Sequence, residues 1–468
     1  MKKQEIKKMS EKLFSKRRLV WDVMSEKEKA GVWEFDRQYK NFLNSAKTER
    51  EAAARIVEMA AKSGFSSDLG STQPIRMVRS FLEKSVALCL SGKRPLEEGI
   101  NLIISHLDSP RLDLKQNPLY EDIDLAFMKT HYYGGLKKFQ WLARPLAIHG
   151  RVIRSDGSTL DIMVGEDEDD PVFTVADILP HLAKKVQTNK KVSEAFEGEK
   201  LNLMVGSLPF GNEDTKDRFK LAILNILNEQ YGLIEEDLIS AELEVVPAGR
   251  ARDVGWDRAL TGAYGHDDRS CVFTSLRAIM DLHRPQKTAL VLFVDKEEIG
   301  SEGATGAKSK FLESVVADLM TAHGKEPHYH EIQTILMNSR AISADVNGAM
   351  DPDYQDVHEK RNAARLGYGI CLTKFTGSGG KYGASDANAE YVGWIRNLFN
   401  QKKVVWQTGE LGKVDEGGGG TVAKFLAPYG MNIMDCGPAV LSMHSPFEIV
   451  HKGDIYMNYK GYKVFLES

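Results

Sequence analysis

Imidazoles and carboxylates follow several apolar runs of the sequence, at the point where each run ends. In open α/β sheets, ligands bind beyond the carboxyl ends of the strands, so such side chains can converge on one site. Amide and thiol groups are almost absent from these positions. The set therefore suits divalent metal ions better than a nucleophilic triad. It comprises His106 and Asp108 after Leu102–Ile104, Asp267 and Asp268 before a helix near Ser270, Asp295, Glu297 and Glu298 after Leu290–Val294, Asp345 after Thr334–Met337, and His444 near the C-terminus.

A pair of metal ions would account for these donor types. Zn²⁺ binds histidine nitrogen and carboxylate oxygen at about 2.0–2.2 Å, and a catalytic site keeps one position open for water. Two ions roughly 3.5–4 Å apart need one carboxylate that bridges them. They also need a carboxylate that is not a ligand, to take a proton from the water. Adjacent side chains diverge, so one member of Glu297–Glu298 can bind metal while the other faces the substrate.

Each of these features also has a purely structural explanation. His106 and Asp108 could form a surface turn, and a pair of adjacent glutamates is commonly solvated surface. Asp267 and Asp268 could cap the following helix, a role that is compatible with metal binding. His444 alone could be an ordinary core or surface histidine.

The elements around these residues alternate between strands and helices. Thr48 and Glu51 have capping-box spacing before EAAARIVEMAAKS, and Gly64 ends that helix. After residue 251, apolar runs alternate with helical patterns, which indicates an α/β domain whose strands are covered on both faces. The predicted helices are SCVFTSLRAIMDL and KFLESVVADLMTAH, and the predicted strands are TALVLFV, TILMNS, YGICLTKF, KVVWQT and MNIMDCG.

The middle of the chain has a different texture. From about Lys115 to Val246, aromatic residues, glycines and turn dipeptides indicate β-rich structure with hairpin-like breaks. A helix is predicted from about Asp214 to Tyr231, ended by Gly232. The acidic run from Glu166 to Asp170 is interpreted as a solvated loop.

Length and composition narrow the class of protein. The chain has 468 residues, 27% of them charged and 42% hydrophobic, which is typical of a globular protein of roughly two to four domains. A net charge of -4 makes nucleic acid a poor partner. The basic N-terminus lacks the apolar run of a signal peptide, and no stretch approaches the ~20 apolar residues of a membrane span. Four scattered cysteines suit a reducing compartment, so we expect a cytoplasmic protein without a membrane partner.

Four motifs in order resemble the aspartyl aminopeptidase family of dinuclear zinc exopeptidases. They are ISHLDSPRLDLK, VDKEEIGSEGATGAKS, ISADV and LSMHSPFE. The stretches ILPHLA and GGLKKFQWLARPLAIHGRV resemble the inserted β domain of that family. The resemblance implies a three-layer α/β/α catalytic domain with a mixed central sheet, formed by residues 1–107 and 248–468. It also implies a β-rich insertion at 108–247 that mediates dimerisation.

The resemblance also implies an activity and an assembly. The expected function is that of a zinc metalloaminopeptidase, a hydrolase that removes the N-terminal residue from peptides through a dinuclear metal-bound water. Two divalent ions are expected as cofactors, with Zn²⁺ favoured over Co²⁺ or Mn²⁺. The family forms homo-oligomers, namely dodecamers built from dimers. Alternatives are another dinuclear amidohydrolase, such as a deacylase or carboxypeptidase, and a non-catalytic assembly protein.

Site roles follow from the resemblance residue by residue. Asp267 would bridge the metals, Glu297 would be the general base, and Asp108 would orient His106. His181 resembles a histidine that reaches the active site of a neighbouring subunit. The remaining assignments are His106 and Asp345 for one metal, Glu298 and His444 for the other, and Lys374 and Tyr382 near the substrate side chain.

The sequence also departs from the family pattern. Two histidines that usually follow the aspartate ligand are missing from the stretch Asp345–Pro352, which instead contains Asp351. Asp268 occupies a position that is usually asparagine, and Ala143 one that is commonly aspartate. A lost imidazole and an added carboxylate make the pocket less favourable for an acidic side chain, so a preference for acidic N-terminal residues is not expected.

Overall fold

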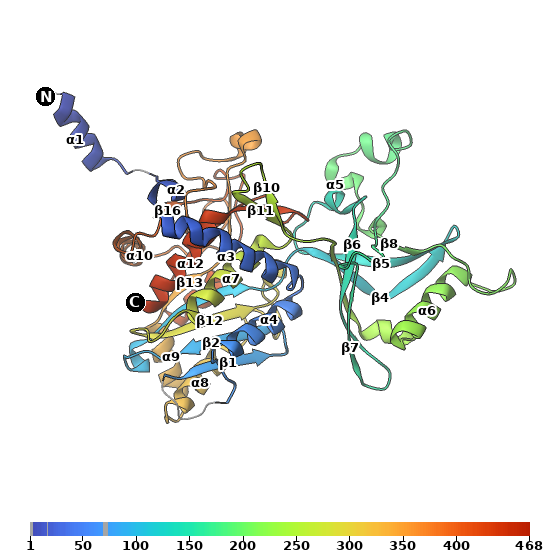
Figure 1. Ribbon diagram of the computed structural model, residues 1–468, viewed down its shortest axis with the longest axis horizontal. Helices are drawn as coiled ribbons and strands as arrows, with labels where there is room; N and C mark the ends of the chain where they lie inside the picture. Colours follow the sequence, from blue (N-terminus) through green and yellow to red (C-terminus); the bar gives the residue numbers. More distant parts are fainter. Residues whose placement is uncertain (1–2, 16, 69–73) are drawn as a thin grey trace.

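The computed structural model describes residues 3–15, 17–68 and 74–468, and a mixed eight-stranded sheet forms its centre (Figure 1). The four central neighbours β12, β3, β13 and β17 run parallel, whereas β1, β2 and β15 join through antiparallel pairings. Parallel neighbours bring the carboxyl ends of their strands to one edge of the sheet. In sheet order the strands are β1 (Arg76–Phe81), β2 (Ser85–Leu90), β12 (Thr288–Val294), β3 (Ile100–His106), β13 (Arg340–Ser343), β17 (Asn432–Gly437), β15 (Ile370–Thr373) and β16 (Trp406–Thr408).

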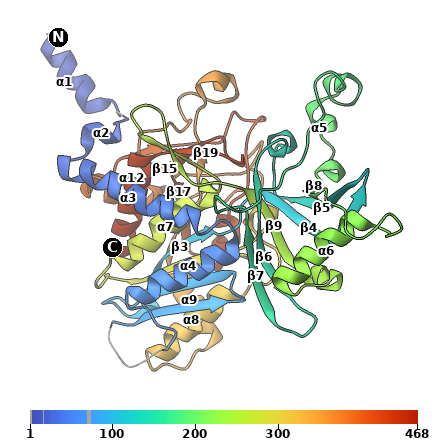
Figure 2. The same cartoon turned by 45° about the vertical axis from the view of Figure 1, so that its right-hand side comes forward.

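Helices cover both faces of this sheet, and each face has its own apolar core. One face carries α3 (Glu26–Asn44), α4 (Glu49–Lys62), α7 (His266–Met280), α10 (Ala389–Gln401) and α12 (Lys452–Glu467). The other carries α8 (Phe311–Ala322), α9 (Tyr329–Met337) and α11 (Ala423–Leu426). Figure 2 shows α4 and α7 on the opposite side of the strands from α8 and α9. The expected mixed α/β fold is confirmed.

Local signals in the sequence account for several of these elements. The hydroxyl of Thr48 caps α4 by accepting the main-chain N–H of Glu51, and the carboxylate of Glu51 accepts the main-chain N–H of Thr48. Gly64 follows the helix with φ +84°, a conformation that favours glycine. The apolar run TALVLFV forms β12 and is buried along its whole length. The strands predicted in YGICLTKF, KVVWQT and MNIMDCG are present as β15, β16 and β17.

The strand predicted for TILMNS is wrong, because these residues end helix α9. Ile332, Ile335 and Leu336 are buried on one face of that helix, the spacing of an amphipathic helix. The short apolar run is compatible with either a strand or a helix, and only the residues that precede it show the helical spacing. The strand that leads to Asp345 is β13, which begins at Arg340.

A second sheet of six strands lies entirely within residues 111–247 and stands to one side of the central sheet (Figure 1). It packs with α6 (Arg218–Tyr231) around a separate apolar core, and Gly232 ends that helix as predicted. The strands, in sheet order, are β7 (Thr159–Val164), β6 (Leu146–Ile153), β9 (Glu242–Pro247), β4 (Arg111–Asp122), β5 (Leu125–Tyr133) and β8 (Leu203–Gly206).

The acidic run differs from its interpretation at one residue. Residues 166–170 form turns, and most of the run is exposed. Glu166 instead lies largely buried, where it pairs with Lys47 and contacts His149. Two buried cations therefore hold Glu166 away from solvent, and this pairing could not be read from the charge run alone.

A third, small sheet carries the C-terminal part of the site. Its strands are β10 (Arg252–Val254), β11 (Leu260–Ala263), β19 (Glu448–His451), β18 (Ala439–Leu441) and β14 (Asn347–Gly348). The remaining helices are α1 (Lys3–Leu13), α2 (Val20–Val23) and α5 (Val192–Ala195). Among the described residues, no helix combines the length and apolarity needed to cross a bilayer.

Candidate metal centre

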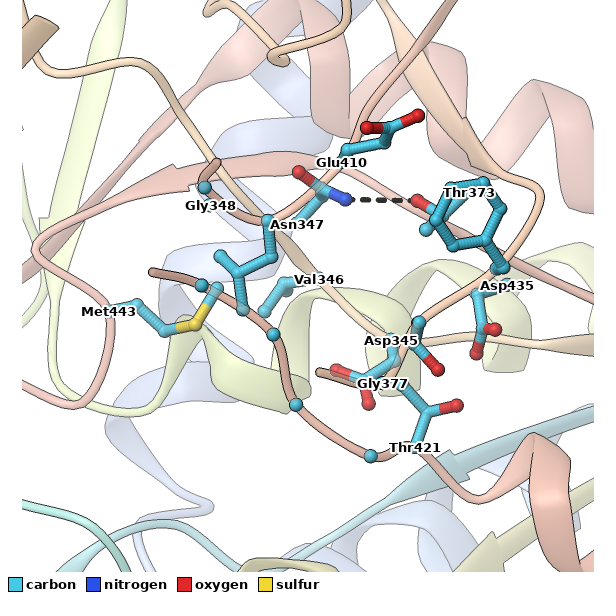
Figure 3. A pocket seen from close by; sticks show the side chains of 18 of the residues that line it. Asp345, Val346, Asn347, Gly348, Thr373, Gly377, Glu410, Thr421, Asp435 and Met443 are labelled. Carbon is cyan, nitrogen blue, oxygen red and sulfur yellow. Dashed lines mark hydrogen bonds between the residues drawn. The ribbon is translucent and has the colours of Figure 1, made fainter. Parts of the chain in front are cut away.

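The candidate ligands come together at the carboxyl edge of the central sheet, beside a cavity of about 420 Å³ (Figure 3). His106 is the last residue of β3, and Asp345 follows β13 by two residues. Glu297 and Glu298 form a turn shortly after β12. Asp267 lies at the start of α7, and His444 lies between β18 and β19. The expected convergence of distant strand ends is therefore what the structure shows.

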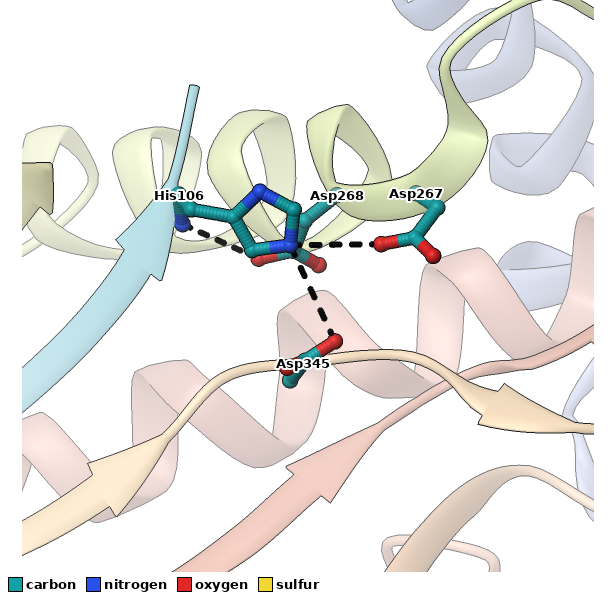
Figure 4. Close-up of side chains that lie close together, drawn as sticks. All are labelled: His106, Asp267, Asp268 and Asp345. Atoms are coloured by element: carbon teal, nitrogen blue, oxygen red, sulfur yellow. Dashed lines mark hydrogen bonds and ion pairs between the residues drawn. The ribbon is translucent and has the colours of Figure 1, made fainter. Parts of the chain in front are cut away.

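Asp267 lies between two histidines that are remote in the sequence. Its Oδ1 atom is 3.2 Å from His106 Nε2, and its Oδ2 atom is 3.2 Å from His444 Nε2. The same nitrogen of each imidazole also faces a second carboxylate: Asp345 Oδ1 lies 3.9 Å from His106 Nε2 (Figure 4), and Glu298 Oε1 lies 3.3 Å from His444 Nε2. One carboxylate thus faces two separate groups of donors.

The donor atoms form compact groups of the size that a metal ion requires. Within each group the nitrogen and oxygen atoms lie within 4.8 Å of one another. Nitrogen and carboxylate oxygen are the donors that zinc accepts in catalytic sites. The groups are His106 with Asp267, Asp268 and Asp345, Asp267 with Glu298 and His444, and His106 with Glu297 and Glu298.

Buried oxygens in these groups lack hydrogen-bond partners. Asp267 Oδ1 and Glu298 Oε1 make no hydrogen bond among the described residues, although imidazole nitrogens lie 3.2 and 3.3 Å away. A buried carboxylate oxygen without a partner is strongly destabilising unless a cation neutralises it. The residues present therefore fit divalent metal cations.

The ionisation of the cluster reflects this excess of negative charge. Burial, and then the carboxylates of Glu298 and Asp108, raise the pKa of Glu297 to about 8, against the opposing effect of His106. Burial by itself would lower the pKa of His444, but the facing carboxylates of Asp267 and Glu298 raise it to about 12. Neighbouring carboxylates thus contribute to both pKa shifts, whereas burial is the largest cause for Glu297 and opposes the shift of His444.

Asp108 organises the turn that carries the two glutamates. Its main-chain oxygen accepts a hydrogen bond from His106 Nδ1 at 3.0 Å, and its Oδ1 atom lies 3.4 Å from the same nitrogen. Its carboxylate accepts the main-chain N–H groups of Glu297 and Glu298, each at 3.1 Å, and the hydroxyl of Tyr133 at 2.8 Å. Asp108 therefore holds a histidine by its second nitrogen and also positions both glutamates.

One residue at the site was missed by the sequence reasoning. Glu448 accepts the main-chain N–H groups of Asp267 and His444, at 3.0 and 2.6 Å. It ends the motif LSMHSPFE, but no feature of that motif indicated this contact. Asp268 is among the candidate donors of the sequence but has no assigned metal; it lies in the first donor group and accepts the main-chain N–H of His106 at 3.2 Å.

The cavity beside the donors is closed by loops that approach each other closely. Its wall includes parts of residues 373–379 and 410–421. A Cβ atom on Gly417 would lie 2.1 Å from the main-chain oxygen of Leu411, and one on Gly418 would lie 2.1 Å from that of Gly377. The glycine run therefore lets one backbone pass close to another.

Three predicted substrate-binding residues do not line this cavity. His181 is exposed on the segment that contains the six-stranded sheet. Tyr382 is 87% exposed, and Lys374 Nζ pairs with Asp386 Oδ1 at 2.8 Å. The neighbouring residues Phe375 and Thr376 do line it. For His181, contact with a partner subunit stays a prediction.

Known proteins share both this sequence and this architecture. The family model of the aminopeptidase I zinc metalloproteases (M18) matches residues 42–466. A probable M18 family aminopeptidase 1 of Borrelia garinii is 50% identical over 96% of this chain and 99% of its own. The crystal structure of an M18 aminopeptidase from Thermotoga maritima is 44% identical, with a TM-score of 0.93 over 97% of this chain and 100% of its own. A dodecamer of the aminopeptidase mApe1 from S. cerevisiae shares the fold at 21% identity, with a TM-score of 0.73 over 92% of this chain and 95% of its own. This chain therefore belongs to the M18 family of zinc metalloproteases and is an aminopeptidase.

Proposed function

We propose that the enzyme uses two divalent ions, shared by Asp267. The observation that carries this proposal is the pair of 3.2 Å approaches from the two oxygens of Asp267 to two different imidazoles. His106 and Asp345 complete one site, and Glu298 and His444 complete the other. Asp268 offers a further oxygen to the first site. Zinc is the preferred metal, with cobalt and manganese as alternatives.

The residues of the chain divide the work of hydrolysis among them. When bound, the two ions supply an acidified water and polarise the scissile carbonyl. Glu297 accepts the proton from the attacking water and passes it to the leaving amine. Its burial and its carboxylate neighbours favour holding a proton, and positive charge in the donor groups returns it to the basic form.

The substrate is a peptide with a free N-terminus, whose first side chain occupies the cavity beside the ligands. A deacylase or carboxypeptidase of similar architecture is the nearest rival. Hydrolysis of a free-amine peptide but not of its N-acetyl form distinguishes the two. The free amine would be anchored near the two metal ions, as the family resemblance implies.

The chain is further proposed to have two units and to act as a homo-oligomer. Residues 1–107 and 248–468 form the catalytic unit, and residues 108–247 form an insertion that pairs subunits. Exposed apolar side chains on that insertion, Leu182, Val192 and Leu208, support a contact surface there. The shared fold of the yeast dodecamer supports an assembly of twelve built from dimers, in which His181 reaches a neighbouring site. Light scattering on the purified protein gives the subunit number.

A cytoplasmic location is also proposed, because it fits four unpaired cysteines that are all buried.

Substitution of the two adjacent glutamates tests the proposed roles. Glu297→Gln should keep two metal ions per chain and lower kcat by about 10²- to 10⁴-fold, the usual contribution of a general base. Glu298→Gln should lose metal from one site. Glu302→Gln is the matched control, because Glu302 is an exposed carboxylate near the same turn. Normal turnover by Glu297→Gln would show that another group takes the proton.

A further inference from the structure

A further buried carboxylate faces the cavity, on the strand next to the one that leads to Asp345. Asp435 lines the cavity and is only 3% exposed. In the described parts of the chain, neither of its carboxylate oxygens has a hydrogen-bond partner. The hydroxyl oxygens of Ser343 and Thr421 lie next to it, and these atoms also make no hydrogen bond of good geometry within those parts. Figure 3 shows Asp435 and Thr421 with their oxygens turned into the same space.

The position of Asp435 relative to the metal centre follows from strand register. Ser343 of β13 pairs with Asp435 of β17, and Asp345 comes two residues after Ser343. With a rise of about 3.3 Å per residue and strands about 4.8 Å apart, the Cα atoms of Asp345 and Asp435 lie roughly 8 Å from each other. A fully extended lysine side chain is of similar length. Asp435 therefore lies within reach of the tip of a long substrate side chain held at the metal centre.

Within the described ranges of the chain, no basic side chain is placed to compensate the charge of Asp435. Burial raises the pKa of Asp435 to about 6, and the Ser343 and Thr421 hydroxyls only partly oppose this effect. Lys424 also lines the cavity, but its side chain is exposed, and Lys413 is half-buried. A buried carboxylate without a partner is costly unless a ligand supplies the opposite charge. The cluster of carboxylate and hydroxyl oxygens is thus suited to an ammonium or guanidinium group.

The features that would attract an acidic side chain are weak in the same cavity. Lys374, the lysine expected near the substrate, pairs with Asp386 and does not line the cavity. Asp386 also pairs with Lys381 at 2.8 Å. The stretch after Asp345 contains no histidine that could face an acidic residue. The buried charge in this wall is therefore negative.

We propose that Asp435 binds the positively charged side chain of the N-terminal residue, so that the enzyme prefers peptides that begin with lysine or arginine. The Thr421 hydroxyl, which also lines the cavity, accepts a further hydrogen bond from the same group. This inference rests on the proposed function, because it places the first residue of the peptide against the metal centre. Asp435 determines specificity and takes no part in bond cleavage.

Matched substrates test the preference in the intact, metal-loaded enzyme. The fluorogenic amides of lysine, arginine, glutamate and 2-aminoheptanoic acid are compared by kcat/KM. The last has a side chain as long as that of lysine but no charge. The wild-type enzyme should favour lysine over 2-aminoheptanoic acid by roughly 30-fold, as expected for a buried charge pair. Asp435→Asn should lose most of this preference for lysine. Its kcat/KM for the 2-aminoheptanoyl amide should stay within about threefold of the wild-type value.

Controls separate this inference from its alternatives. Glu416→Gln removes an exposed carboxylate from the neighbouring loop and should keep the wild-type ratio, which excludes a general effect of net charge. If Asp435→Asn does not fold, the ratio of kcat/KM for the lysine and 2-aminoheptanoic acid amides in the wild-type enzyme still tests the inference. Equal values for the two amides would overturn it. If the two amides are hydrolysed at equal rates and both rates rise with added Na⁺ or K⁺, the Asp435 carboxylate binds an inorganic cation instead. Absence of hydrolysis of every amide would contradict the proposed function itself.

Discussion

His444 donates a hydrogen bond from Nδ1 to the main-chain oxygen of Gly135, 2.7 Å away. Gly135 belongs to the segment that forms the six-stranded sheet, whereas His444 follows a strand of the small C-terminal sheet. This contact leaves Nε2 of the imidazole facing Asp267 and Glu298. The segment that carries the six-stranded sheet therefore orients a proposed metal ligand through Gly135.

Gly134→Ala should impair the site through this same loop. Gly134 has φ +74°, and an added Cβ would lie 3.3 Å from Glu298 Cβ and 3.3 Å from Pro110 Cγ. Gly157→Ala is the matched control, because Gly157 has φ +81° and no atom within 4 Å of such a Cβ. Both variants should lose about 1 kcal/mol of stability from the left-handed backbone. Gly134→Ala alone should lose activity, by about tenfold; equal activity of the two would refute the coupling.

Asp108→Asn should weaken metal binding without removing a ligand. The amide of asparagine cannot accept hydrogen bonds at both atoms, so the turn with Glu297 and Glu298 and the orientation of His106 are disturbed together. Loss of such a supporting residue typically lowers metal affinity or activity by about 10- to 100-fold. Tyr133→Phe removes one donor to Asp108 and should have a smaller effect in the same direction. Metal titration calorimetry provides the measurement, and unchanged affinity in both variants would argue against this role.

Removal of metal should lower thermal stability. The site buries the carboxylates of Asp267, Glu297, Glu298 and Asp345, which repel one another until cations neutralise them. At a free zinc concentration of 100 times Kd, each bound ion stabilises the folded state by about 2.7 kcal/mol. Chelation should therefore lower Tm by several degrees, and added zinc should restore it. A Tm that is the same with and without chelator would contradict the assignment.

His149→Gln should flatten the dependence of stability on pH. His149 lies between Glu51 Oε1 at 2.7 Å and Glu166 Oε1 at 3.2 Å, and Lys47 also pairs with Glu166. Burial lowers the pKa of His149, but the two carboxylates outweigh it and raise the pKa above its ordinary value. The protonated histidine therefore stabilises the fold fully below about pH 6.5, and that stabilisation is lost as pH rises through the higher folded pKa.

Chemical denaturation at pH values from 6 upward tests whether stability falls with rising pH in this way. The wild-type free energy of unfolding should fall by up to about 1.4 kcal/mol per pH unit relative to the variant. His328→Gln is the control, since His328 is exposed. Parallel curves for wild type and His149→Gln would show that this histidine does not contribute.

Local sequence patterns correctly predicted the helices and strands that are formed by interactions between residues close in the sequence. The capping pair of Thr48 and Glu51 and the apolar run of β12 each act within a few residues, so their structures follow directly. The strand prediction for TILMNS was wrong because the first four of these residues belong to a longer helical pattern that starts at Tyr329. A short apolar run is compatible with a strand or a helix until its neighbours are considered.

The sequence by itself determined which chemical groups are present and that they stand at strand ends, since the order of apolar and polar residues is a property of the chain. It also carried the family motifs. Only the tertiary structure decided that one carboxylate faces two imidazoles, that Glu448 accepts hydrogen bonds from two ligand residues, and that Asp435 is buried without a partner. These relationships join residues up to 338 positions apart, as in the pair of His106 and His444. Their distances are set by strand order and helix packing, which no local pattern encodes.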